Sequence, residues 1–358
     1  MQGSEAVAFR PGVMLLFVTL ALLMAAVVVL SLGAGAVDIS PRRVLAIFAA
    51  GLGLTDQTAT PREALVLFDI RAPRTLLGLL AGAALAVSGA LMQGLFRNPL
   101  ADPSLVGVSS GSALAAAASI VVGDRLIAAF WPAGTTLPFA VLPAAAFLGG
   151  LITTTVLYVI ATRQGRTSVT TMLLAGVALA ALAGALTGLL VYVADDRQLR
   201  DLTFWSLGSL GGATWTKVAA VAPAVLLVIV AAPVLARGLN ALLLGEAEAY
   251  HVGVAVQRLK RLAILLTALA VGVAVAACGA IGFVGIVVPH VIRLACGPDH
   301  RVLLPASALL GGSLLVGADV LARLLVSPSE LPIGILTAAV GAPFFLWLLL
   351  RGGRGTFA

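Results

Sequence analysis

The sequence predicts an all-α, polytopic membrane protein with about ten transmembrane helices, organised as one domain over residues 1–358. Two observations lead to this fold class. Of all residues, 61% are hydrophobic and only 10% are charged, whereas a soluble domain carries about 25% charged residues. The apolar residues also form continuous runs rich in leucine, alanine and valine, without the alternation of membrane β-barrel strands. Lipid must therefore be the solvent for most of the chain.

Ten apolar runs are the predicted spans: residues 13–32, 75–93, 105–122, 142–161, 172–193, 218–235, 262–278, 282–295, 302–326 and 335–350. The first run is too long for a signal peptide and only Arg10 precedes it as a positive charge, so we expect a retained helix. The eighth run would cover only about 21 Å of a ~30 Å hydrocarbon core. Glycines precede its Pro289, which predicts a broken helix beside either a transport pathway or a tight helix contact.

Three connections are too long to be turns. The first, residues 34–74, is expected to hold a surface helix at 40–52, and the second, residues 195–217, holds a mixed polar and apolar stretch at 199–210. The third, residues 236–261, is expected to form one or two short amphipathic helices at 242–252 and 255–262. Ser40 and Pro41 support the first helix, because they suit the N-cap and the first helical position. Phe204 and Trp205 give the second connection side chains that favour the membrane–water interface. Gly253 is expected to be the hinge of the third.

Charge predicts the orientation of the spans. With the N-terminus inside, the inner segments hold slightly more than half of the 22 lysines and arginines and account for the net charge of +7. Arg163 with Arg166, and the cluster at residues 258–261, are the strongest local signals. Both termini and residues 236–261 are then cytoplasmic. Because the basic residues are scattered between spans, we expect contact with membrane lipid and not with nucleic acid.

The chain lacks the motifs that would make it an enzyme. Lys217 and Lys260 are the only lysines and neither follows a glycine, so a phosphate-binding loop is excluded and any nucleotide energy must come from another chain. Cys278 and Cys296 have no metal-ligand spacing, so we expect no metal site and no resident cofactor. Asp319 is the clear intramembrane acid, and Arg323 four residues later favours a structural pair over a proton relay.

Several motifs occur in a fixed order along the chain: Arg71-Ala-Pro-Arg74, Gly89-Ala-Leu-Met-Gln93, Arg97-Asn-Pro-Leu-Ala-Asp-Pro103, Gly107-Val-Ser-Ser-Gly111, Gly279-Ala-Ile-Gly-Phe-Val-Gly-Ile-Val-Val-Pro-His290 with Arg293, Asp299-His-Arg301, Glu330-Leu-Pro-Ile-Gly334 and Gly341-Ala-Pro343. From about residue 38 to 351, this pattern resembles the FecCD family of permeases, the type II ABC importers for ferric siderophores, haem and vitamin B12. The resemblance implies a non-catalytic subunit of the bacterial inner membrane that forms a homodimeric pore. It also implies three partners: a second copy of the chain, two copies of a cytoplasmic ATPase that binds ATP, and a periplasmic binding protein.

The resemblance also assigns site residues. Those of the coupling segment, which would contact the ATPase, are Leu244, Gly245, Glu246, His251, Gly253 and Val254. Those that would dock the binding protein at the outer surface are Arg71, Arg74 and Arg323, although lipid headgroups or the acids Asp69 and Glu330 are alternative partners. Those expected at inner helix ends, as helix stops or alternatively as ATPase-contact or gate residues, are Asn98, Pro99, Pro289, His290 and Arg293.

The transported substrate is the least constrained inference. Residues 196–205 look most similar to haem importers, and Arg197 and Arg200 could attract haem propionates at the outer mouth or pair with neighbouring aspartates. We therefore expect haem as the transported substrate, with ferric siderophores and cobalamin as alternatives. An ion-coupled secondary transporter is the alternative from another class, and a membrane scaffold that transports nothing is a third.

Overall fold

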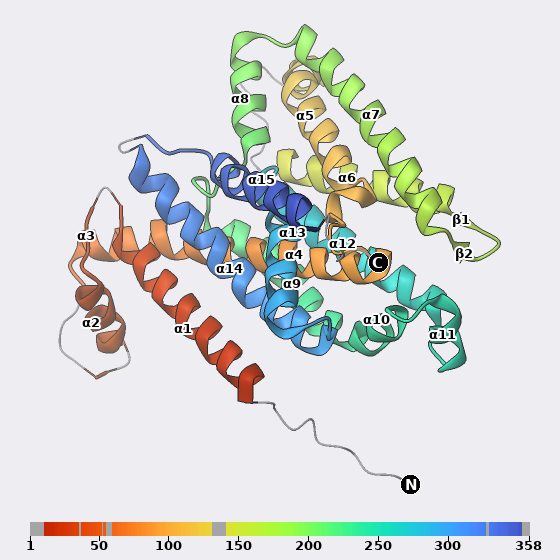
Figure 1. The fold of residues 1–358 in the computed structure, drawn as a ribbon. Helices are drawn as coiled ribbons and strands as arrows, with labels where there is room; N and C mark the ends of the chain where they lie inside the picture. Colours follow the sequence, from red (N-terminus) through yellow and green to blue (C-terminus); the bar gives the residue numbers. More distant parts are fainter. Residues whose placement is uncertain are drawn as a thin grey trace.

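The computed structural model describes residues 11–35, 37–51, 53–54, 59–130, 141–326 and 329–352. Its elements follow one another along the chain (Figure 1) as α1 (Pro11–Gly33), α2 (Pro41–Gly51), α3 (Pro61–Ala64), the π-helical η1 (Leu65–Arg71), α4 (Ala72–Phe96), the 3₁₀ turn η2 (Pro103–Val106), α5 (Val108–Phe130), α6 (Val141–Ala161), β1 (Thr162–Arg163), β2 (Arg166–Thr167), α7 (Val169–Val193), α8 (Asp196–Leu207), α9 (Trp215–Ala231), η3 (Ala232–Leu235), α10 (Ala236–Leu242), α11 (Glu246–His251), α12 (Val256–Cys278), α13 (Val284–Cys296), α14 (His300–Leu325) and α15 (Ile333–Gly352).

The described helices confirm the all-α membrane fold. Seven of them are long and apolar enough to cross a membrane, and three shorter apolar helices accompany them: Val108–Gly123, Val284–Cys296 and Ile333–Leu348. Each of the ten predicted spans coincides with one of these helices. Helix α13 begins at Val284 and continues past Pro289 to Cys296, so the irregular backbone, in which Phe283 has a left-handed φ of 67°, precedes the short eighth span and does not interrupt it.

Helix α4 is the centre of the molecule. It is buried along almost its whole length and packs against α14, α12, α13 and α9. In Figure 1, α14, α9, α13 and α12 surround it, whereas α5, α6 and α7 form a second group that joins the centre through α12. Helix α1 packs on α14 at the other side. The core is therefore built around one helix of small and apolar residues.

Glycines allow the closest helix contacts around α4. A Cβ atom at Gly89 would collide with the carbonyl oxygen of Gly285 in α13, and one at Gly82 would collide with that of Gly311 in α14. Small residues let membrane helices approach until their backbones touch, which maximises van der Waals contact where lipid provides no hydrophobic driving force. Of the two surroundings predicted for the short eighth span, the structure shows a tight helix contact.

The connections gather at two opposite ends of the bundle. At one end, which we call the outer end, the indole Nε1 of Trp215 donates to the carbonyl of Phe68 at 2.9 Å, and the N–H of Ile333 donates to Gly208 at 3.1 Å. At the other, the inner end, Asn240 donates to the carboxylate of Asp299 at 2.6 Å. The chain therefore sorts its connections as the charge pattern predicts, and which end faces the cytoplasm stays a prediction.

Two of the three predicted short helices form. Helix α2 begins at Pro41, with the N–H of Arg43 bonded to the Ser40 hydroxyl at 3.3 Å. The second connection holds α8, a helix that the sequence pattern did not predict. In the third connection α11 is a separate helix and Gly253 has a φ of 86°, so the hinge is where it was expected. The separate helix predicted at 255–262 is wrong, because those residues are the first turns of α12, which continues without interruption to Cys278.

The glycine contact predicts a stability difference between two alanine substitutions. Gly89→Ala should lower the free energy of unfolding by about 2–3 kcal/mol, because its methyl group would overlap the Gly285 backbone. Gly184→Ala in α7, where nothing lies within 4 Å, should be neutral or stabilising by about 0.5–1 kcal/mol through helix propensity. Thermal unfolding of both variants in the same detergent measures the difference. Equal melting temperatures would contradict this account of the packing.

Candidate functional site

A buried ion-pair network lies at the outer end, between α4 and α14. The Arg74 guanidinium donates through Nη2 to the carboxylate of Asp319 at 2.8 Å and through Nη1 to Glu330 at 2.7 Å. Arg323 completes the network, with its Nε 3.1 Å from the same Asp319 carboxylate. The side chains of Arg74 and Asp319 are only 9% and 2% exposed. The pair predicted between Asp319 and Arg323 is confirmed, and a second arginine shares the acid.

Arginines also close the C-terminal end of α1. Arg71 donates to the carbonyl oxygens of Leu32, Gly33 and Val37, at 2.7 and 2.6 Å for the first two. Arg323 donates to the carbonyls of Ala34 at 2.9 Å and Ser31 at 3.2 Å. The last carbonyls of a helix have no partner within the helix and carry partial negative charge, so cations there are stabilising. These two arginines thereby bind α1 to η1 and α14.

The three predicted docking arginines therefore lie at the outer end, but they do not face outward. Arg71 is 5% exposed and Arg74 is 8% exposed. The suggested pair between Asp69 and Arg71 is replaced by backbone carbonyls, because the nearby end of α1 offers several acceptors at once. Only Glu330, whose side chain is 46% exposed, is a partner that an outside carboxylate could replace. Docking by these arginines stays a prediction.

The coupling segment protrudes at the inner end. Gly245 has a φ of 129°, which turns the chain away from α10 so that the short helix α11 extends beyond the bundle, at the right-hand edge of Figure 1. Leu244 and Tyr250 are each 73% exposed, and His251 and Val252 are also exposed. Glu246, on the first turn of α11, pairs with Lys260 of α12 at 2.7 Å. The segment presents apolar side chains on a small, fixed helix, a surface suited to a groove on a partner protein.

The predicted inner helix ends divide into two groups. Helix α4 ends at Phe96, Arg97 adopts a left-handed φ of 50°, and the Asn98 side chain accepts from the N–H of Leu100 at 2.9 Å; Pro99 follows in the same turn. Pro289 is different, because α13 continues past it to Cys296. The helix stop expected there is wrong. Proline removes a bond to the Gly285 carbonyl, which lies instead against Gly89 of α4.

His290 and Arg293 follow Pro289 on α13 and lie inside the bundle. The imidazole of His290 is buried and packs edge-to-face against Phe344 of α15, with ring centroids 6.1 Å apart. Arg293 is half-buried one turn further along α13. The contact joins α13 to α15, which is a link that the sequence motif did not indicate. Their role as gate residues stays a prediction.

An outer cavity of about 500 Å³ lies beside α8. It is lined by both charged and aromatic side chains, among them Arg197, Asp201, Phe204, Trp205 and Lys217. Arg197 is 80% exposed and its Nε is 3.9 Å from Asp201, a distance that allows only a weak ion pair. Arg200 is exposed on the same helix but does not line the cavity. The structure thus brings Arg197 to the cavity and leaves Arg200 at the surface.

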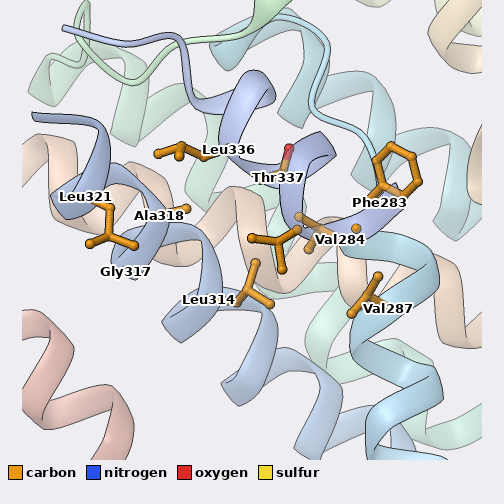
Figure 2. A pocket seen from close by; sticks show the side chains of 11 residues that line it. Phe283, Val284, Val287, Leu314, Gly317, Ala318, Leu321, Leu336 and Thr337 are labelled. Carbon is orange, nitrogen blue, oxygen red and sulfur yellow. The ribbon is translucent and has the colours of Figure 1, made fainter. Parts of the chain in front are cut away.

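A second, apolar cavity of about 250 Å³ lies between α13, α14 and α15. Figure 2 shows Val284 and Val287 of α13 facing Leu314 of α14, with Phe283 and Thr337 at its rim. Phe283 packs so closely on α15 that a Cβ atom at Gly341 would collide with its ring. The irregular start of α13 is therefore held in place by α15.

The described residues form a bundle of helices long and apolar enough to cross a membrane, from which α11 protrudes at one end, as in the membrane subunit of a transporter. The profile of the FecCD transport family matches residues 22–351, and the chain belongs to this family. It is a permease of an ABC importer.

Three relatives illustrate the likeness. The hemin transport system permease HmuU of Yersinia pestis is 46% identical over 291 residues, which cover 79% of this chain and 82% of that protein. The cobalamin import system permease BtuC of Halobacterium salinarum is 47% identical over 294 residues, with 82% of this chain and 76% of that protein covered. The solved structure described as an inward-facing metal-chelate type ABC transporter has a TM-score of 0.81 and 34% identity, and covers 94% of this chain and 99% of that chain.

The buried network predicts a loss of stability when its central acid is removed. Asp319→Asn should lower the free energy of unfolding by about 3 kcal/mol, because it leaves two buried guanidinium groups without their shared countercharge. Asp69→Asn, at an exposed acid of η1, is the matched control and should change it by less than about 0.5 kcal/mol. Thermal unfolding in detergent compares the two. A stability loss of the same size in both variants would refute the role given to Asp319.

Proposed function

We propose that the chain is the translocation subunit of a bacterial importer for haem, working as a homodimer in the inner membrane. A cytoplasmic ATPase in two copies would hydrolyse ATP and contact α11, and a periplasmic binding protein would deliver haem at the outer end. The observation that supports haem is the outer cavity, which is lined by Arg197 together with the aromatic side chains of Phe204 and Trp205. A flat, largely apolar ring with carboxylate substituents suits aromatic walls and a guanidinium group. Haem here is the transported substrate, not a resident cofactor.

Cobalamin is the second candidate substrate. Identity to a cobalamin permease is 47%, against 46% to a hemin permease, so overall similarity favours neither. The proposal of haem therefore depends on the outer mouth, and Arg197 and Arg200 are the residues to test. A ferric siderophore is the third candidate, since one related structure is described as a metal-chelate type transporter.

Transport in vesicles tests the proposed function. Vesicles that contain the permease, its ATPase and a haem-loaded binding protein should accumulate haem when ATP is supplied, because energy enters through α11. They should accumulate no haem when only a proton or sodium gradient is supplied. Uptake driven by an ion gradient without ATP would instead show a secondary transporter. Loading the binding protein in turn with haem, a ferric siderophore and cobalamin identifies the substrate, and R197Q/R200Q should reduce haem uptake about tenfold. An unchanged rate would remove the support that the cavity gives to haem.

Docking of the binding protein is tested through Glu330. We propose that a carboxylate of that protein takes the place of Glu330 on Arg74 Nη1, because this contact is the partly exposed one in the network. Glu330→Gln should then raise the affinity of the empty permease for its binding protein about tenfold, because it removes a competing charge and leaves the Asp319 pair intact. Titration in nanodiscs measures the affinity, and D69N controls for the loss of one outer charge. Equal affinities for E330Q and the unaltered protein would contradict docking on Arg74.

A further inference from the structure

Lys260 is buried at the inner end of the molecule, and a buried lysine requires partners for its charge. Its side chain is 3% exposed, and its ammonium group is 2.7 Å from the Glu246 carboxylate of α11. The same nitrogen donates to the carbonyl oxygen of Thr167 in β2 at 2.9 Å. Lysines are almost never buried unless paired, because the loss of hydration must be offset by a countercharge and hydrogen bonds. Lys260 thus joins two segments far from one another in the sequence.

Two residues close to Lys260 on α12 also bind the β1–β2 hairpin. The N–H of Thr167 donates to Oε1 of Gln257 at 2.9 Å, and Nη2 of Arg261 donates to the carbonyl of Gly165 at 3.3 Å. Residues 257, 260 and 261 lie on one face of a helix, since they are three and four positions apart. The β1–β2 hairpin, paired Thr162 to Thr167 and Arg163 to Arg166, is thereby held against the start of α12. In Figure 1 the hairpin and α11 lie at the same end of the molecule.

The hairpin is the direct connection between α6 and α7. Helix α7 is exposed along most of its length and packs within this chain mainly on α5 and α6. A helix with few buried contacts on one side can change position at a smaller cost in free energy than the buried α4. Any displacement of the hairpin therefore reaches α7 directly.

We infer that Lys260 is a positioning residue that makes α11 and the β1–β2 hairpin move as one body, so that a partner's push on α11 is passed to α6 and α7. The inference rests on the proposed coupling role of α11. Glu246 supplies the charge on the α11 side and Thr167 the acceptor on the hairpin side. Without the ammonium group between them, α11 could tilt without displacing the hairpin.

A reversible cross-link tests whether the hairpin keeps its distance from the first turns of α12, which carry Lys260, during transport. With Cys278 and Cys296 replaced by alanine, T167C and Q257C are joined by a short bifunctional thiosulfonate reagent and released by dithiothreitol. Because the two positions keep their distance in a rigid body, ATP-driven transport by the cross-linked complex should stay within about twofold of the released complex. Loss of transport that dithiothreitol restores would overturn the inference. Absence of ATP-driven transport in the released complex would refute the proposed function instead.

Substitution of Lys260 tests the ammonium group itself. Lys260→Met keeps the long apolar stem, and the number of substrate molecules transported per ATP hydrolysed should fall about tenfold, because the buried ammonium that joins α11 to the hairpin is lost while α11 can still bind the ATPase. Lys260→Arg should restore most of this ratio. Arg258→Met, at an exposed residue on the same turn, is the matched control and should leave the ratio unchanged. A fall in transport matched by an equal fall in ATP hydrolysis would mean a purely structural role and would overturn the inference.

Discussion

The shared carboxylate of Asp319 is the interaction on which the arrangement of the bundle depends. It is buried, and it receives guanidinium groups from both Arg74 of α4 and Arg323 of α14. Arg323 also binds the end of α1, so three helices meet at one acid. In a low-dielectric interior such a group is stable only when fully paired, which fixes the relative positions of the helices that supply the partners. The close glycine contacts of α4 can then form along the rest of its length.

The inner end also has an ion pair with a buried cation, that of Lys260 with Glu246. Lys260 is as deeply buried as the outer arginines, but its partners belong to a short protruding helix and a hairpin, not to the central helices. An ion pair between the central helices α4 and α14 holds them in one arrangement, whereas one between peripheral segments makes them move together. On the inference drawn above, the polar contacts divide the molecule into a fixed centre around α4 and a connected peripheral group that includes α11, the hairpin and α7.

The sequence predicts the elements of this structure better than it predicts their contacts. Apolar run lengths and the Ser40–Pro41 pair are local signals, so the spans and α2 are found where they were expected. The acceptors of Arg71 lie about forty residues away, and no local pattern indicates that a guanidinium will face backward onto α1. Pro289 misleads for a similar reason, because its effect depends on how α4 packs against Gly285. In the sequence Lys260 is one member of a basic cluster, and only its burial in the fold distinguishes it from exposed Arg258.

Near-equal identity to permeases for two different cargoes constrains where selectivity can lie. A hemin permease and a cobalamin permease are 46% and 47% identical to this chain. The residues common to all three chains cannot be the ones that distinguish the cargoes. The packing glycines and the buried ion pairs serve the fold whichever molecule passes, and an apolar conduit must bind its cargo weakly to release it. Selectivity then lies with residues that differ between the chains or with the partner that delivers the cargo, and under the proposed function the exposed side chains of α8 at the outer cavity are the candidates.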